Sequence, residues 1–205
     1  CLIKHSAAYC PKLKLGKHSA VTIDIKSCSK NSETQNAERF RQTLLASEPS
    51  LDHPDIKAVI LCALPLQRAQ LDLVMLYYDP RPVDLQLKTP DGTPIHSFVL
   101  LVEVKHHSSD RVRFEGVKVH VRYGDKWSDV TDQCDRQTFA LKDFQTSAFE
   151  GAKCRNGTFV QRAIWLPSVQ PNSLNSRLPK GSVAVHLADL SWANLVDSFV
   201  KNRGQ

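Results

Sequence analysis

Three ionisable side chains stand in stretches of the sequence that are otherwise apolar. Asp72 interrupts the run Leu71–Tyr78, and Glu103 and Lys105 stand at the end of the most apolar run in the chain, which begins at Phe98. Burying a charge is costly unless the charge is paired, binds a metal or belongs to a site. Because residues two apart on a strand point to the same side, we expect Glu103 and Lys105 to share one face.

Two carboxylates and a lysine on neighbouring strands are suited to metal-dependent hydrolysis of a phosphodiester. Carboxylate oxygens bind Mg²⁺, a bound metal polarises the phosphate and lowers the pKa of water, and a lysine can orient that water or stabilise the phosphate charge. The acid-x-Lys triplet alone is unspecific, because it occurs at 24–26, 55–57 and 103–105. Only the third lies in a long apolar strand and follows both an Asp-bearing strand and a helix that carries Glu33 and Glu38.

Strands and helices that could position these residues are visible in the residue patterns. Alternating or apolar runs predict strands at 19–25, 58–64, 71–78, 83–87, 98–104, 117–123, 159–166 and 183–187. Helical spacing predicts helices at 33–46, 132–149 and 192–200, with Phe139, Leu141 and Phe144 of the second one in the core. This order predicts an α/β protein with a mixed central β-sheet flanked by helices.

The order of a helix with Glu, a strand with Asp, a strand with Glu-x-Lys and a helix with Gln resembles the PD-(D/E)xK nuclease superfamily. It is most similar to the nuclease-related domain called NERD. The matching motifs are Ser32-Glu33 to Glu38, Gln70 to Val74, Leu101 to Lys105, Gly124 to Trp127 and Gln133 to Gln137. The likeness covers residues 31–150 and implies a restriction-endonuclease-like core. Ser32 replaces a family glycine, Gln133-Cys134 replaces Asn-Pro, and segment 79–97 lengthens the spacing.

The resemblance implies a metal-dependent deoxyribonuclease with Mg²⁺ or Mn²⁺ as its cofactor. Asp72, Glu103 and the carbonyl of Val104 would bind the metal. Lys105 would position water, Glu33 would be an outer acid, and Gln137 would contact the metal-bound water or a phosphate. Family members are bacterial or archaeal and cytoplasmic, and many are fused to a helicase or another module in DNA processing or defence.

Two of these assignments have a competitor in the sequence. Asp84 is nearer to Glu103 along the chain than Asp72 is. A tight hairpin would leave Asp84 about 13 Å from Glu103, at the rise of a strand. If segment 79–97 is instead an insertion, Asp72 lies beside Glu103, and we favour this alternative. Glu38 competes with Glu33 for the helix acid, although Glu33 shares the face of the apolar residues.

Basic residues follow the Glu-x-Lys motif and could contact nucleic acid. Lys118, His120 and Arg122 alternate and therefore share one face of a strand, where they could bind phosphates without sequence preference. Arg111, Arg113 and His106 are further candidates. The sequence shows no interleaving of aromatic and basic residues of the kind that stacks single-stranded bases. DNA is the expected partner, and RNA stays open.

Composition sets the class of protein. The chain has 205 residues and a net charge of +6, and 41% of its residues are hydrophobic, which is typical of a globular domain. No apolar run approaches the ~20 residues of a membrane helix. The chain begins with Cys1, as an excised piece would. We expect a basic segment 1–30 packed on a nuclease-like domain 31–205.

Reduced cysteines are expected, and the irregular set Cys1, Cys10, His18 and Cys28 fits a zinc site poorly. Two alternatives to an enzyme stay open. One is a catalytically inactive nucleic-acid-binding module with a nuclease fold. The other is a structural or interaction domain in which arginines pair with Asp72 and Glu103.

Overall fold

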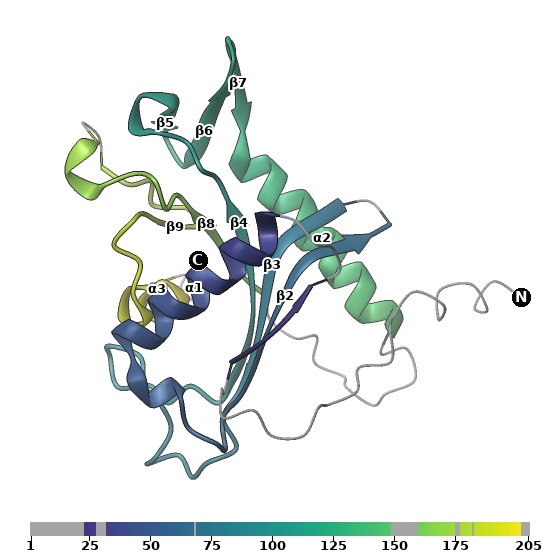
Figure 1. Cartoon of the computed structure of the whole chain (residues 1–205), viewed down its shortest axis with the longest axis vertical. Coiled ribbons are helices and arrows are strands. Elements are labelled where there is room, and N and C mark those ends of the chain that lie inside the picture. The colour runs from purple at the N-terminus through teal and green to yellow at the C-terminus, as the bar shows by residue number, and fades with distance from the viewer. Residues whose placement is uncertain are drawn as a thin grey trace, which may run out of the picture.

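A six-stranded mixed β-sheet forms the centre of the computed structural model (Figure 1). The structure describes residues 23–27, 32–67, 69–148, 160–174, 177–181 and 183–201. The strands lie in the order β1 (Ile23–Ser27), β2 (Lys57–Leu66), β3 (Ala69–Tyr78), β4 (Ser97–Val104), β8 (Val160–Trp165) and β9 (Ala184–His186). β3 is antiparallel to both of its neighbours, and the other pairs are parallel. The expectation of a mixed α/β sheet is confirmed.

Helices cover both faces of this sheet. α1 (Ser32–Ser47) and α3 (Trp192–Lys201) pack on one face, and α2 (Val130–Ala148) packs on the other (Figure 1). β4 contributes alternate residues to both layers, because Leu100 faces α1 and α3 whereas Leu101 joins the cluster of α2. A strand buried on both faces needs apolar residues at every position, which explains the continuous apolar run.

A second, three-stranded sheet follows β4 in the chain. It consists of β5 (Val112–Glu115), β6 (Lys118–Tyr123) and β7 (Lys126–Asp129), all antiparallel. Gly116 and Gly124 occupy the connecting turns with φ of +60° and +56°, where a side chain would be strained. Only the central strand of this sheet is expected from the sequence, because β5 and β7 are too short to show a clear alternation.

Three short 3₁₀ turns connect the described helices and strands, at Pro49–Leu51, Ser109–Arg111 and Pro171–Ser173.

Two expectations from the sequence differ from the structure. The strand expected at 83–87 is wrong, because the carbonyl of Pro82 accepts the N–H groups of Leu85 and Gln86 and closes a turn instead. The core assignment of two phenylalanines is also wrong, because Phe139 is 65% exposed and Phe144 is 52% exposed.

The first part of the chain contributes to the main sheet. Within segment 1–30 only residues 23–27 are described, and this strand pairs in parallel with β2. It therefore belongs to the same sheet as β3 and β4. The cysteine and histidine set at positions 1, 10, 18 and 28 lies outside the described residues. Among the helices of the described ranges, none combines the length and the apolarity that crossing a membrane would require.

Candidate functional site at the ends of β3 and β4

Asp72 and Glu103 face each other across two adjacent strands. Leu73 lies opposite Val102 in the antiparallel register, so the next position along brings Asp72 opposite Glu103. Directly opposed residues of an antiparallel pair point to the same face. The N–H of Val104 donates to Asp72 Oδ2 at 2.9 Å, which fixes the carboxylate at the strand end.

Asp84, the competitor of Asp72, lies elsewhere. It is exposed and occupies the turn after Pro82, in the connection that joins the far ends of β3 and β4. Segment 79–97 is therefore an insertion between the two site strands, as the favoured alternative requires. Of the two aspartates, Asp72 is the one that the fold brings beside Glu103.

Lys105 completes the group. Its Nζ lies 2.5 Å from Glu103 Oε1, the Glu103 side chain has no exposed surface, and the lysine side chain is 13% exposed. Burial acts to lower the pKa of Lys105, but the charge and hydrogen bond of Glu103 outweigh it and hold this pKa above its ordinary value. Lys105 is therefore protonated at neutral pH.

Burial disfavours the charged form of both carboxylates. Burial raises the pKa of Glu103, and the charge of Asp72 raises it further, while Lys105 opposes both effects. Burial also raises the pKa of Asp72, and the charge of Glu33 adds to this rise, while the N–H of Val104, the charge of Lys105 and a hydrogen bond with Glu103 oppose it. Acidic groups with raised pKa values close to one another are typical of functional sites.

Two glutamines of α2 contact residues at this end of β3 and β4. Gln133 Nε2 donates to Glu103 Oε1 at 2.6 Å, and Gln137 Nε2 donates to the carbonyl of Gln70 at 3.0 Å. Glu103 Oε2 and Gln137 Oε1 are buried and lack a hydrogen-bond partner within the described chain. Gln133 is absent from the sequence-based assignments, although its spacing of four from Gln137 puts both on one helix face.

The start of α1 supplies a third acid. The charge of Glu33 acts on Asp72, whereas Glu38 accepts hydrogen bonds at 2.7 Å from Arg41 and at 2.7 Å from Gln42. Glu33 is thus the helix acid that lies near the site, and Glu38 is held along its own helix.

His106 joins α1 to the end of β4. Its Nε2 lies 2.6 Å from Asn36 Oδ1, three residues after Glu33. Burial and then the charge of Arg39 lower the pKa of His106, and the charge of Asp72 opposes them. His106 therefore lies beside the candidate site, on its α1 side.

β2 is distorted where it passes Asp72. Ala63 has φ of +52°, the left-handed region that residues other than glycine rarely adopt. The β2–β3 ladder passes from Cys62 opposite Leu73 to Leu64 opposite Leu71 and omits the pair between them, which is Ala63 and Asp72. The register is the same on both sides of this gap, so no residue is inserted, and the distortion is confined to the backbone of Ala63 beside Asp72.

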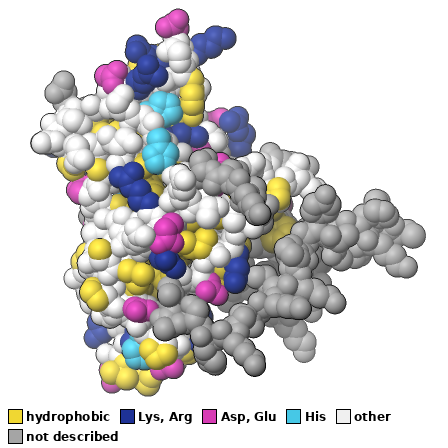
Figure 2. Space-filling model, viewed as in Figure 1, with side chains coloured by type: hydrophobic (Ala, Val, Ile, Leu, Met, Phe, Trp, Pro, Cys, Tyr) yellow, Lys and Arg dark blue, Asp and Glu magenta, His cyan; other side chains and the backbone are white. Residues whose placement is uncertain are grey.

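The basic residues expected to contact nucleic acid lie on and before the small sheet. Lys118 Nζ lies 2.7 Å from Asp129 Oδ2, and Arg113 Nε lies 2.9 Å from Glu115 Oε1, so two of these charges are paired. Arg111 and Arg122 form no ion pair within the described ranges. Figure 2 shows Lys and Arg side chains gathered at the end of the molecule where this sheet lies, with acidic side chains between them.

The donor set of the site fits a hard divalent cation. Asp72 and Glu103 offer carboxylate oxygens, and one buried oxygen of Glu103 has no hydrogen-bond partner in the described residues. No group of three or more His, Cys, Asp or Glu side chains that could hold a metal occurs in those residues. Mg²⁺ commonly uses one or two protein carboxylates and completes its octahedron with water and substrate phosphate, so two carboxylates suffice.

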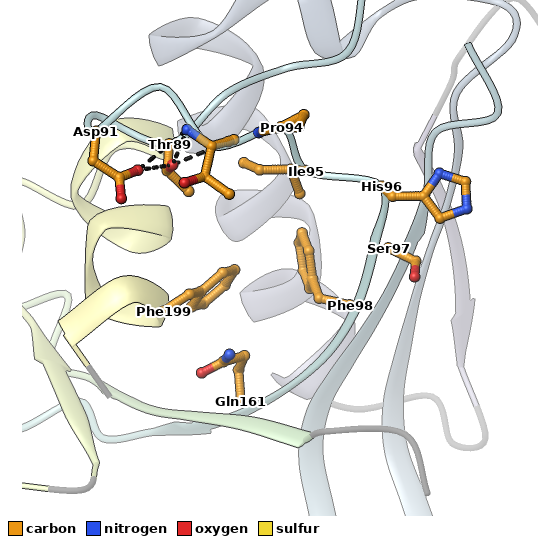
Figure 3. Close-up of a pocket in the computed structure, with 10 residues that line it drawn as sticks. Thr89, Asp91, Pro94, Ile95, His96, Ser97, Phe98, Gln161 and Phe199 are labelled. Atoms are coloured by element: carbon orange, nitrogen blue, oxygen red, sulfur yellow. Dashed lines mark hydrogen bonds between the residues drawn. The ribbon is translucent and has the colours of Figure 1, made fainter. Parts of the chain in front are cut away.

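A separate cavity lies at the opposite end of β4. It has a volume of about 350 Å³ and is lined by Thr89, Asp91, Phe98, Gln161 and Phe199 among others (Figure 3). The hydroxyl of Thr89 donates to Asp91, which is the one carboxylate among the lining residues. This cavity lacks the convergence of titratable groups found at Glu103, so it is not the candidate site.

Comparisons with known proteins add no relative to this picture. No family model, no curated protein and no solved structure matches the chain. The geometry of the residues and the sequence motifs are therefore the basis for any functional assignment.

Proposed function

We propose that this chain is a metal-dependent nuclease domain of the PD-(D/E)xK type, which hydrolyses phosphodiester bonds in DNA. The observation that carries the proposal is the meeting of Asp72, Glu103 and Lys105 at the ends of two adjacent strands, with one buried oxygen of Glu103 lacking a partner in the described chain. The order of elements also supports it, because Glu33 comes from a preceding helix and Gln137 from a following one.

Asp72, Glu103 and the carbonyl of Val104 would hold Mg²⁺ or Mn²⁺. When bound, the metal supplies Lewis-acid activation of the phosphate and of a water molecule. The carbonyl of an extended residue lies on the same side of the strand as its N–H. Since the N–H of Val104 donates to Asp72, its carbonyl points to the β3 side of β4.

Lys105 acts as a donor and as a positive charge. Its raised pKa keeps the amine protonated, so it cannot accept a proton as a general base. An ammonium has three N–H donors, and the bond to Glu103 uses one of them. The other two can hold a water or a phosphate oxygen and stabilise negative charge that develops on the phosphate.

The remaining polar groups orient the carboxylates. Gln133 holds one oxygen of Glu103, which leaves the other directed away from the amide. Gln137 keeps a buried amide oxygen that can accept a hydrogen bond from a water molecule. Glu33 adds negative charge beside Asp72 and so favours a cation there.

A cleavage assay tests the proposal. Supercoiled plasmid and linear DNA are incubated with wild type, Asp72→Asn, Glu103→Gln and Lys105→Met in Mg²⁺, Mn²⁺ or EDTA. We expect cleavage by wild type that EDTA abolishes, and losses of about 100-fold or more for each variant, since each removes charge needed in the transition state. Asp84→Asn is the matched control and should cleave like wild type, because Asp84 lies in an exposed turn.

Equal cleavage by all five proteins would identify a contaminating nuclease and remove the proposal. Cleavage that persists in EDTA would contradict a metal-dependent mechanism. Circular dichroism of each variant establishes that a loss of cleavage does not reflect unfolding.

One observation favours a second candidate, a nucleic-acid-binding module that has lost catalysis. Glu103 is fully buried and already paired with Lys105, so its charge is balanced without a metal. In that case the protein would bind DNA and would not cleave it, and Mn²⁺ would not change its melting temperature. An interaction domain has less support, because Asp72 and Glu103 form no ion pair with an arginine within the described residues.

The cellular setting is likewise a proposal. The family resemblance implies a bacterial or archaeal cytoplasm and a fused or associated helicase. An RNA substrate is an outcome of the same assay when labelled RNA replaces DNA.

A further inference from the structure

The small sheet has one buried face and one outer face. Val119 and Val121 of β6 belong to the hydrophobic cluster of α2, and Val112 of β5 joins them. Because successive residues of a strand point to opposite sides, Arg122 of β6 lies on the outer face. The register puts Trp127 of β7 directly opposite Arg122, so these two share that face.

Trp127 is stacked with arginines on this outer face. The guanidinium carbon of Arg113 lies 4.3 Å from the centroid of the Trp127 ring, and that of Arg122 lies 5.9 Å away. This corrects the expectation that aromatic and basic residues do not interleave. The sequence hides the arrangement because its three members come from three different strands.

The outer face carries more positive than negative groups. Arg113 and His120 share Glu115, and Lys118 pairs with Asp129. Arg122 forms no ion pair within the described chain, and its Nε is buried without a hydrogen-bond partner there. An unpaired guanidinium next to an aromatic ring fits a ligand that combines an anion with a flat apolar group.

We propose that the outer face of β5, β6 and β7 binds an unpaired nucleic-acid strand, with Trp127 and Arg113 stacking a base and Arg122 contacting a phosphate. This inference deepens the proposed function by naming the form of the substrate. Bases in a duplex are stacked on their neighbours and expose only their edges, whereas an unpaired strand offers the flat face of each base to an aromatic ring. The surface therefore selects single strands.

The proposed surface lies close to the candidate site. Tyr123, the last residue of β6, packs edge-on against His107 with ring centroids 4.8 Å apart. His107 follows Lys105 by two residues, and the charge of Lys105 acts on it. Tyr123 also acts electrostatically on Lys105, so the end of β6 lies beside the lysine of the candidate site.

The test measures binding without cleavage. Glu103→Gln protein in EDTA is titrated with a fluorescent thymidine oligonucleotide of about 20 nucleotides, with a duplex of the same length and with an abasic oligonucleotide of the same charge. We expect the thymidine strand to bind about tenfold more tightly than either comparison ligand, since stacking contributes roughly 1–3 kcal/mol per base. In a protein with no mutation in the sheet, the thymidine strand, and not the abasic one, should also quench the tryptophan fluorescence, because Trp127 is partly exposed whereas Trp165 and Trp192 are buried.

Variants separate stacking from charge. Trp127→Ala should weaken binding of the thymidine strand about tenfold and leave the abasic strand unchanged, and Trp127→Phe should recover part of the loss. Arg122→Ala should weaken all three ligands by a similar factor, because a phosphate contact carries no base information. Phe139→Ala, an exposed aromatic on α2, is the matched control and should change none of them.

Equal affinity for the three ligands, or quenching by the abasic strand, would overturn the inference and indicate a non-specific polyanion surface. If Trp127→Ala loses all binding, the variant could simply be unfolded. The quenching, which is measured in a protein without that substitution, then decides whether a base stacks on the tryptophan. Trp127-dependent binding without any cleavage by wild type would support this surface and reject the nuclease proposal, so the two can fail separately.

Discussion

Two carboxylates at the ends of β3 and β4 are both disfavoured in their charged forms. Burial raises the pKa values of both Asp72 and Glu103, the charge of Asp72 raises that of Glu103 further, and the nearly buried Lys105 compensates these effects incompletely. Such an arrangement lowers the stability of the fold unless something positive binds between the acids. Stability measurements on these residues therefore report on function.

Asp72→Asn should make the protein more stable. The asparagine oxygen can still accept the N–H of Val104, while the cost of burying the carboxylate charge, its repulsion by Glu33 and its effect on the ionisation of Glu103 disappear. Asp72→Ala, in contrast, leaves that N–H without its acceptor and should lose about 1–3 kcal/mol. Urea denaturation at neutral pH in EDTA measures both, and a destabilised Asp72→Asn would contradict the description of the pair.

A single alanine bends β2 beside Asp72. Ala63→Gly should raise the free energy of unfolding by up to about 1 kcal/mol, because glycine adopts a positive φ without strain. Ala58→Gly in the same strand, where φ is ordinary, should instead lower it by about the same amount. Thermal melting of both variants measures these changes in stability. Equal losses of stability for the two variants would mean that Ala63 is not strained.

At the scale of elements, residue patterns locate most strands and helices, and the exceptions have physical causes. The predicted ranges of β2, β3, β4 and β8 agree with the structure because long apolar runs mark buried strands. The assignment of Phe139 and Phe144 to the core fails because it follows the hydrophobic character of the two side chains, whereas their position around the helix decides which of them are buried. The buried stripe of α2 follows Val130, Cys134 and Leu141.

The orientation of α2 can be tested with two substitutions. Leu141→Ala should destabilise the protein by about 2–4 kcal/mol, because it opens a cavity in the cluster between α2 and the sheet. Phe139→Ala should change stability by no more than about 0.5 kcal/mol, because that ring is exposed. The reverse order of the two effects in urea titrations would show that the helix is rotated.

The connection between the site strands has an ionic anchor. Asp79 is fully buried and accepts hydrogen bonds from Arg81 Nε at 2.8 Å and Nη2 at 2.7 Å, and from the Tyr77 hydroxyl at 3.3 Å. Asp79→Ala should cost about 3 kcal/mol, because it leaves Arg81 as a nearly buried, unpaired charge. Asp84→Ala in the same connection should be close to neutral, and a similar loss for both would rule out this anchor.

At the scale of the whole molecule, the sequence indicates the charged residues of the candidate site better than it indicates the contacts around them. Asp72, Glu103 and Lys105 are recognisable because charges inside apolar runs need an explanation. The contact of Gln133 with Glu103, the distortion at Ala63 and the arginine–Trp127 stack depend on how separate elements meet. No local pattern of residues contains that information.

Global stability should fall at acidic pH through one buried histidine. Burial lowers the pKa of His186 in β9 to about 4, below its ordinary 6.5. Between these values the unfolded chain binds a proton that the folded protein does not, so stability drops as pH falls from 6.5 towards 4.

His186→Leu should remove this contribution and flatten the pH dependence by roughly 1 kcal/mol per pH unit. Urea midpoints for wild type and variant between pH 7 and 4.5 measure the difference. Parallel curves for the two proteins would show that His186 is not buried in its neutral form.

The most direct test of the central proposal is Mn²⁺ binding, followed by electron paramagnetic resonance of the free ion. Wild type should bind Mn²⁺ and reduce the signal of the free ion, whereas Asp72→Asn and Glu103→Gln should weaken that binding about 10-fold or more, since each removes a charged oxygen ligand. Lys105→Met should retain it. Absence of binding by wild type, or binding that neither carboxylate variant alters, would contradict a metal site between β3 and β4.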